Sequence, residues 1–211
     1  MKLVFPRLYV IMDADLLAAP ALAVAEILTG AGVEFIQYRN KQASSRRLLE
    51  AATELSGFAR PRGVKLIVND RADVAALCGA GGVHVGQDDL EVADARRIVG
   101  ANCILGISTH NLDQVQAAAA TGADYIAFGP IFPTQTKRDP DPVVGVEGLR
   151  RARKLTNKPM VAIGGITAER ALEVYDAGAD CVAVASDVLS ASNTAARVRQ
   201  YLEVAGSVAR G

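Results

Sequence analysis

The chain has 211 residues, of which 50% are hydrophobic and 22% are charged, a composition that excludes global disorder and allows a sizeable core. Its 23 basic residues equal its 23 acidic ones, so the net charge gives no reason to expect nucleic acid or an anionic membrane as a partner. Asp13 interrupts the N-terminal apolar stretch too early for a signal peptide, and no apolar run approaches the roughly 18 residues of a membrane span. The three scattered cysteines lack metal-ligand spacing and are typical of buried thiols in a reducing compartment. We therefore expect a cytoplasmic protein.

Eight short apolar runs recur along the chain, and most are rich in valine and isoleucine. Runs that are apolar nearly throughout are typical of parallel strands covered on both faces. In chain order, the expected strands are residues 8–13, 34–39, 65–70, 82–87, 103–109, 124–129, 159–165 and 180–186.

Amphipathic segments separate these runs, and several end in Gly-Ala or Ala-Gly, which supplies a glycine where a helix end favours a left-handed residue. The strict alternation predicts an α/β fold, a single (β/α)8 TIM barrel that occupies residues 1–211 as one domain. An open doubly wound sheet is the alternative, and the lack of a G-x-G-x-x-G after the first strand disfavours it. In a TIM barrel the functional residues are expected at the carboxyl ends of the strands.

The second expected strand ends in QYRNK, which places Gln37, Arg39 and Lys41 two residues apart. Alternate residues of a strand share a face, so the three side chains can point to one region. Two cations and an amide at the barrel mouth are suited to a polyanion. The alternative is a solvated strand end that happens to be basic.

Carboxylates follow the third and fourth strands, which end at Asn69-Asp70 and run into Asp88-Asp89. Neighbouring parallel strands lie about 4.8 Å apart, so Asp70 and Asp89 could hold one cation between them. Magnesium often takes one or two protein carboxylates, with water and phosphate oxygens completing its shell. Each aspartate could instead cap a helix. We favour a cap for Asp88 and a magnesium site for Asp70 with Asp89.

Hydroxyl and imidazole groups occur on the fourth and fifth strands. Ser108 or Thr109, at the end of the fifth, could bond a polar heterocycle or cap the next helix, and the sequence does not separate these roles. His84 stands in mid-strand, which favours a packed, hydrogen-bonded core histidine. His110 lies beyond its strand, which favours a capping or solvent role.

The seventh and eighth strands end in Gly164-Gly165 and Ala185-Ser186. Phosphate sites of TIM barrels are often built after these strands, where backbone N–H groups meet a helix N-terminus. Glycine lets a backbone approach an anion closely, although a glycine needed only for barrel curvature is the alternative. We therefore expect a monophosphate site here, beside the diphosphate site of the second to fourth strands.

Two phosphate-bearing ligands side by side suggest an enzyme that joins two substrates, with diphosphate as the leaving group. No Ser-His-Asp or Cys-His pattern supports covalent catalysis. A proline-rich loop, residues 128–142 with the sequence FGPIFPTQTKRDPDP, follows the sixth strand. Loops of this length are usually functional or disordered. We interpret this one as a lid whose Thr134, Thr136 and Lys137 fold over a diphosphate and exclude water.

The motifs QYRNK, LIVND, GVHVGQDDL, GIST, FGPIFPTQTK, VAIGGI and VAVASDV, in this order, resemble thiamine-phosphate synthase over nearly the whole chain. The resemblance implies a transferase that condenses 4-amino-5-hydroxymethyl-2-methylpyrimidine diphosphate with 4-methyl-5-(2-phosphooxyethyl)thiazole to thiamine monophosphate and diphosphate. It implies Mg²⁺ as cofactor, small molecules as partners, and a dissociative step in which diphosphate leaves before the thiazole nitrogen attacks. The oligomeric state stays open, with a homo-oligomer as one option.

The same resemblance implies a role for each motif residue. Arg39, Lys41 and Lys137 would be catalytic, because they would stabilise charge on the leaving diphosphate. Asp70 and Asp89 would hold Mg²⁺. The substrates would be bound by Gln37, Arg39, Lys41, Asn69, Ser108, Thr134, Thr136, Lys137, Gly165, Ala185 and Ser186. The chain departs from the family at Ala185, where an isoleucine or similar residue is usual, a change that matters little if the contact is a backbone amide.

Three other functions compete with the synthase. A thiazole tautomerase-like isomerase shares the barrel, but in that relative the loop carries a histidine where Pro130 stands and the paired aspartates are missing. A non-catalytic thiazole-phosphate-binding homologue would have no need of the intact charged residues, which are Arg39, Lys41, Asp70, Asp89 and Lys137. A phosphosugar isomerase or epimerase would need only the monophosphate site and would leave the paired aspartates unexplained.

Overall fold

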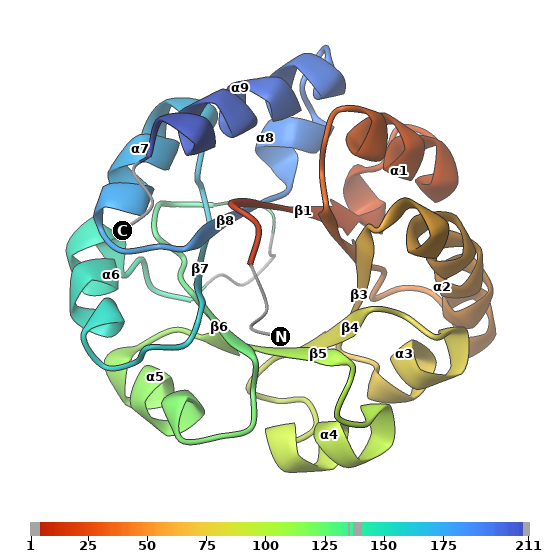
Figure 1. The fold of residues 1–211 in the computed structure, drawn as a ribbon, viewed down its shortest axis with the longest axis horizontal. Helices are drawn as coiled ribbons and strands as arrows, with labels where there is room; N and C mark the ends of the chain where they lie inside the picture. Colours follow the sequence, from red (N-terminus) through yellow and green to blue (C-terminus); the bar gives the residue numbers. More distant parts are fainter. Residues whose placement is uncertain (1–4, 135, 137–140, 209–211) are drawn as a thin grey trace.

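The computed structural model describes residues 5–134, 136 and 141–208. Eight parallel strands form a closed barrel in which each strand pairs with its neighbours in sequence and β8 closes on β1 (Figure 1). This confirms the (β/α)8 barrel expected from the alternation of strands and helices. The strands are β1 (Leu8–Asp13), β2 (Phe35–Arg39), β3 (Lys65–Asn69), β4 (Gly82–Val85), β5 (Ile104–Thr109), β6 (Tyr125–Phe128), β7 (Met160–Ile163) and β8 (Cys181–Val184).

Helices follow the strands and form the outer ring in Figure 1. The α-helices are α1 (Ala21–Gly30), α2 (Ser45–Ala59), α3 (Ala72–Cys78), α4 (Val92–Val99), α5 (Leu112–Ala119), α6 (Gly145–Arg153), α7 (Ala168–Asp176), α8 (Ser186–Leu189) and α9 (Thr194–Ser207). Two 3-10 turns, η1 (Ala14–Leu16) and η2 (Arg60–Arg62), follow β1 and α2. Within the described part of the chain, no helix is long and apolar enough to cross a membrane.

The strands lie within the expected ranges, but five begin one residue later and five end one or two residues sooner. β7 ends at Ile163 rather than at residue 165, because Gly164 and Gly165 have φ values of +97° and +62° and leave the extended conformation. β8 ends at Val184 rather than at 186, because Ser186 already begins α8. The residues after the strands are therefore free to form the loops of the barrel mouth.

Apolar side chains form two separate layers. The larger layer lies between the strands and the helices. The smaller layer fills the barrel interior and includes Tyr9, Phe35, Ile67 and Tyr125. Phe5 closes this interior from the N-terminal end of the strands, with its ring centroid 4.9 Å from those of both Phe35 and Tyr125. The interior of a TIM barrel is dominated by branched apolar residues, so two tyrosines there are an unusual polar content.

Candidate active site at the barrel mouth

Gln37 and Arg39 stand on β2, level with Ile11 and Asp13 of β1. Nη1 of Arg39 donates to Oδ2 of Asp13, whose residue is only 3% exposed. The buried carboxylate fixes the position of the guanidinium at the mouth. Asp13 was not predicted as a site residue, although a polar residue at the end of the first apolar run was a signal for it.

Lys41 lies in the turn after β2, and its Nζ is 3.2 Å from Oδ2 of Asp70. The Lys41 side chain is 54% exposed and that of Asp70 is 21% exposed. An ion pair this open to solvent contributes little to stability. The lysine can therefore be shared with an incoming anion at small cost.

Asp70 follows β3 in a strained backbone conformation. Among the described residues it is the one non-glycine residue with positive φ, +63°. The N–H of Arg71 donates to the carbonyl of Asn69 at 2.8 Å, which closes a three-residue turn around Asp70. The N–H of Asp70 donates to the carbonyl of His84 at 2.7 Å. Three-residue turns with positive φ are rare and strained, and such strain collects at functional sites.

Asp89 brings a second carboxylate to Asp70. Its Oδ2 accepts the N–H of Gly86 at 2.7 Å, which holds the turn after β4. Burial raises the pKa of the Asp70 carboxyl, hydrogen bonding and charge repulsion from Asp89 raise it further, and Lys41 partly offsets them. A divalent cation between the two carboxylates would relieve this repulsion.

This pair of donors fits a magnesium ion. One or two carboxylates are the usual protein contribution to such a site, and the remaining positions go to water and substrate oxygens. Nowhere in the described ranges do three or more histidine, cysteine, aspartate or glutamate side chains gather in a way that could hold a metal. The capping role favoured for Asp88 was wrong, because α4 begins at Val92 with Glu91 as its N-cap, and Asp88 is exposed in the turn before it.

Ser108 and Thr109, at the end of β5, have different partners. Thr109 is 1% exposed and donates its hydroxyl to the carbonyl of Ala127 on β6 at 2.8 Å, so this hydroxyl is used within the sheet. Oγ of Ser108 lies 2.8 Å from Nε2 of His84, and the Ser108 carbonyl accepts Nε2 of Gln87 at 2.5 Å. Of the two hydroxyls, that of Ser108 is the one suited to a ligand.

Of the two histidines, His84 has the environment predicted from the sequence and His110 does not. His84 is the packed, hydrogen-bonded core residue that its mid-strand position predicts, being 7% exposed with Nδ1 2.8 Å from the Tyr125 hydroxyl. His110 was expected to cap a helix or face solvent. Its Nδ1 instead lies 2.7 Å from the carbonyl of Gly129 and 3.3 Å from Oδ2 of Asp141, so it joins the end of β5 to the loop after β6.

Gly164 and Gly165 pack against the start of the loop that follows β6. A Cβ on Gly164 would lie 2.6 Å from Cα of Pro130, and one on Gly165 would lie 2.4 Å from the carbonyl oxygen of Pro133. The N–H of Phe132 also donates to the Gly164 carbonyl at 3.0 Å. The absence of side chains at these two glycines therefore lets the loop pack closely against them. The sequence had suggested two other roles, close approach of an anion and barrel curvature.

Thr134 and Thr136 connect this loop to the end of β8. Oγ1 of Thr134 accepts the N–H of Thr136 at 3.3 Å, and Oγ1 of Thr136 donates to Oγ of Ser186 at 3.4 Å. This contact lies at the strand end where a monophosphate site was expected, whereas both threonines were predicted to fold over the diphosphate. Lys137 lies outside the described residues.

The short helix α8 is held in place by α9. It begins at Ser186, after Ala185 with φ −127° and ψ −84°, and the first N–H groups of a helix have no partners within it. Nε and Nη2 of Arg197 donate to the two carboxylate oxygens of Asp187, each at 2.8 Å. The hydroxyl of Tyr201 also donates to Asp187, at 2.6 Å. The orientation of Ser186 is thus fixed from outside the barrel.

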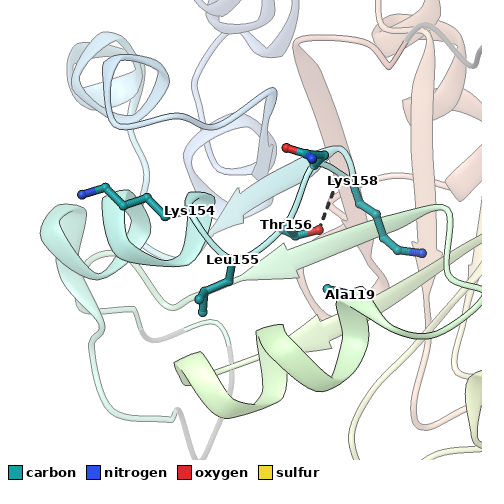
Figure 2. Close-up of a pocket in the computed structure, with 6 residues that line it drawn as sticks. Ala119, Lys154, Leu155, Thr156 and Lys158 are labelled. Carbon is teal, nitrogen blue, oxygen red and sulfur yellow. Dashed lines mark hydrogen bonds between the residues drawn. The ribbon is translucent and has the colours of Figure 1, made fainter.

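A surface hollow of about 490 Å³ lies away from these residues, beside the N-terminal end of β7 (Figure 2). Its lining includes Ala119, Leu155 and Lys158. The Lys158 ammonium donates to the carbonyls of Thr121 and Ala123 at 2.7 and 2.6 Å, so it serves the fold. Residues at this end of a TIM barrel contribute to stability rather than to catalysis.

Comparison with known proteins identifies the family to which the sequence and the fold are similar. The family model described as thiamine monophosphate synthase matches residues 8–188. The thiamine-phosphate synthase of Koribacter versatilis is 53% identical over 87% of this chain and 89% of its own length, and that of Chloroflexus aurantiacus is 49% identical over 92% and 90%. The solved structure of thiamine phosphate pyrophosphorylase from Pyrococcus furiosus superposes with a TM-score of 0.86 at 34% identity, covering 95% of both chains.

Proposed function

The chain belongs to the thiamine monophosphate synthase family and is a transferase, and we propose that its barrel mouth condenses 4-amino-5-hydroxymethyl-2-methylpyrimidine diphosphate with 4-methyl-5-(2-phosphooxyethyl)thiazole. The products would be thiamine monophosphate and diphosphate. The observation that carries the proposal is the division of one mouth into two sides. Arg39, Lys41 and the aspartates lie on one side, and the contact between Thr136 and Ser186 lies on the other.

On the first side, Gln37, Asn69 and Ser108 bind the pyrimidine, and Arg39 and Lys41 bind its diphosphate together with Lys137. The support is the arrangement of the described groups, all but Lys137, on or just after β2, β3 and β5, with Arg39 fixed by buried Asp13. On the second side, the thiazole phosphate is bound by Thr134, Thr136, Gly165, Ala185 and Ser186. The support there is the first turn of α8, whose Asp187 is held by Arg197.

The reaction needs charge stabilisation more than it needs a base. The bond between the pyrimidine methylene carbon and the diphosphate oxygen breaks, and the electron pair leaves with diphosphate. The electron-rich aminopyrimidine stabilises the resulting cation, and the thiazole nitrogen donates its lone pair to form the new C–N bond. No proton has to be moved in these steps. Arg39, Lys41 and Lys137 stabilise the leaving group, and removal of one such preorganised donor costs about 10²- to 10³-fold in turnover.

Mg²⁺ held by Asp70 and Asp89 would add positive charge beside the departing diphosphate. Burial and then the contact with Asp89 raise the pKa of Asp70, and the closeness of the two carboxylates supports a cation at this position. The chain's own contribution is to hold two carboxylates together, through the strained turn at Asp70 and the bond from Gly86 to Asp89.

We also propose that residues 1–211 form one domain that works in the cytoplasm on small-molecule substrates, without nucleic-acid or membrane partners. The family match over residues 8–188 and the balanced net charge support this. The three cysteines are free thiols, as is usual in a reducing compartment.

A diphosphate-release assay with the purified chain tests the proposal. Release and thiamine monophosphate are expected only when both substrates and Mg²⁺ are present. Asp89→Asn should lower turnover by at least about 10²-fold, while its exposed neighbour Asp88 supplies the matched control Asp88→Asn, which should retain it. Absence of release above background with authentic substrates, or equal loss in the two variants, would contradict the proposed reaction or its metal site respectively.

A further inference from the structure

A chain of hydrogen-bonded polar side chains crosses the barrel interior. Nε2 of Gln37 donates to the Tyr9 hydroxyl at 2.7 Å, and the Tyr9 and Tyr125 hydroxyls lie 3.1 Å apart. The Tyr125 hydroxyl is 2.8 Å from Nδ1 of His84, and Nε2 of His84 is 2.8 Å from Oγ of Ser108. These five residues come from five different strands and form a relay between Gln37 and Ser108, the two ends assigned to the pyrimidine.

The relay lies where a barrel normally places apolar side chains. Tyr9 is 1% exposed and Tyr125 is 0% exposed, and both belong to the apolar cluster of the interior. Burying a polar group is costly unless it is hydrogen-bonded, and apolar residues of the same size would fill this space without that requirement. The chain even makes room for the relay, because a Cβ on Gly106 would lie 2.4 Å from the Tyr125 hydroxyl oxygen. Packing alone does not account for it.

Proton counting shows that the relay has a direction. Burial raises the pKa of both tyrosines far above the ordinary value, so each hydroxyl keeps its single proton. Because the Tyr9 oxygen accepts from Gln37, its proton goes to Tyr125, whose own proton goes to Nδ1 of His84. A neutral imidazole that accepts at Nδ1 carries its proton at Nε2, and it donates to Ser108. The Ser108 proton and the Gln37 carbonyl oxygen are then left for a ligand.

We propose that Tyr9, Tyr125 and His84 are positioning residues that couple the two ends of the pyrimidine site, so that Ser108 offers a donor whenever Gln37 offers an acceptor. A 4-aminopyrimidine matches this pair, because its ring nitrogen accepts and its amino group donates. The 4-oxo analogue has the opposite pattern, an N–H beside a carbonyl, and would need the whole relay and the Gln37 amide to reverse. The relay thus selects the amino form. This inference rests on the proposed function, which supplies the aminopyrimidine as ligand.

Tyr125→Phe and Tyr9→Phe interrupt the relay without removing either residue at its ends. Each should raise KM for the aminopyrimidine diphosphate by about 10- to 100-fold, the range expected when buried polar groups lose their partners. Each should leave KM for the thiazole phosphate unchanged and reduce discrimination against the 4-oxo analogue by about 10-fold or more. The matched control is Tyr175→Phe, which removes a buried tyrosine bond of 2.8 Å to the carbonyl of Arg7 outside the relay. It should lower the melting temperature and change no specificity.

Calorimetric binding of the aminopyrimidine diphosphate and of its 4-oxo analogue to the full chain gives a second measurement that needs no turnover. Weaker binding of the amino form and lost discrimination in both relay variants would support the relay. A parent that turns over normally and relay variants that differ from it only in melting temperature, as Tyr175→Phe does, would overturn the relay and leave the proposed function standing. A parent that neither turns over nor binds the aminopyrimidine diphosphate would overturn both.

Discussion

The carboxylates at the two ends of the barrel differ in how fully their charge is compensated by neighbouring donors. At the N-terminal end, Asp124 and Asp180 precede β6 and β8 and make the same pair of contacts. Oδ2 of Asp124 accepts from Arg96 at 2.6 Å and from the N–H of Leu105 at 2.8 Å. Oδ2 of Asp180 accepts from Arg153 at 2.8 Å and from the N–H of Met160 at 2.7 Å. Each carboxylate therefore has a cation and a backbone donor, and each joins two neighbouring strands.

At the mouth, Asp70 has the reverse character. Its backbone is strained, its pKa is raised by burial and by Asp89, and Lys41, its cation, is more than half exposed. A strained backbone and a carboxylate without full charge compensation both lower stability, and such features collect at sites that bind a ligand. The difference supports the proposal that the mouth binds ions, whereas the opposite end stabilises the fold.

Asp70→Asn is the substitution expected to have the largest effect on turnover. We expect turnover with Mg²⁺ to fall by about 10³-fold, because the change removes one of two carboxylates from the metal site. The melting temperature in metal-free buffer should stay the same or rise, because the change removes charge repulsion and asparagine tolerates positive φ. A melting temperature well below that of the parent would instead make Asp70 a structural residue like those at the other end.

Lys137→Ala should lower turnover by about 10²-fold, because the lysine is expected to stabilise the leaving diphosphate. Its melting temperature should match that of the parent. Lys158 is the matched lysine at the opposite end, where it bonds two backbone carbonyls, so Lys158→Ala should lower the melting temperature and retain turnover. Steady-state kinetics and thermal unfolding of both variants measure the contrast, and near-normal kcat in Lys137→Ala would remove the lysine from the mechanism.

Asp180→Ala should act on stability alone. It removes a carboxylate that bonds Arg153 and the N–H of Met160, so we expect the free energy of unfolding to fall by about 2 kcal/mol. Its 48% exposed side chain limits the ionic part of this loss through solvent screening. Urea unfolding gives the free energy, and kcat should stay within about twofold of the parent. A large loss of kcat in a folded variant would show that the two ends are not independent.

The fold could be predicted from the sequence because its signals are local. Each strand is a short apolar run, and glycines end helices, as Gly79 does after α3 with φ +61°. The residues at the strand ends could be named for the same reason, since an alternating pattern such as Gln37, Arg39 and Lys41 lies within one segment.

What the sequence did not predict depends on contacts between distant segments. Tyr9 and Tyr125 are 116 residues apart, and nothing in either strand indicates that their hydroxyls meet. Gly164 looked like an anion-binding or curvature glycine, because the docking of Pro130 against it appears only once β6 and β7 are adjacent. Asp13 could be noticed in the sequence as a polar residue at the end of an apolar run, but its pairing with Arg39 required the register of β1 against β2, which the strand sequences do not contain.

Glu169 is an exception to the contrast between the two ends of the barrel. It lies in the first turn of α7, on the mouth side of the barrel, yet it is paired as the aspartates at the opposite end are, since Nη1 of Arg197 donates to it at 2.6 Å. Hydrogen bonds from Arg197, and then from Thr167, lower the pKa of Glu169 from 4.5 to about 2. Its side chain is 67% exposed, so solvent screening keeps the contribution of the pair to about 0.5 kcal/mol.

A lowered pKa in the folded state stabilises the protein above the ordinary pKa of the carboxyl, and this stabilisation is lost as the pH falls through the folded value. Glu169→Gln should therefore reduce the free energy of unfolding by about 0.5 kcal/mol at pH 7, and the difference from the parent should shrink from pH 4.5 towards about 2. Urea unfolding across this range measures it, with Glu173→Gln on the exposed side of the same helix as the control for loss of charge. A difference that persists at the lowest pH would mean that Glu169 acts through packing and not through its ion pair with Arg197.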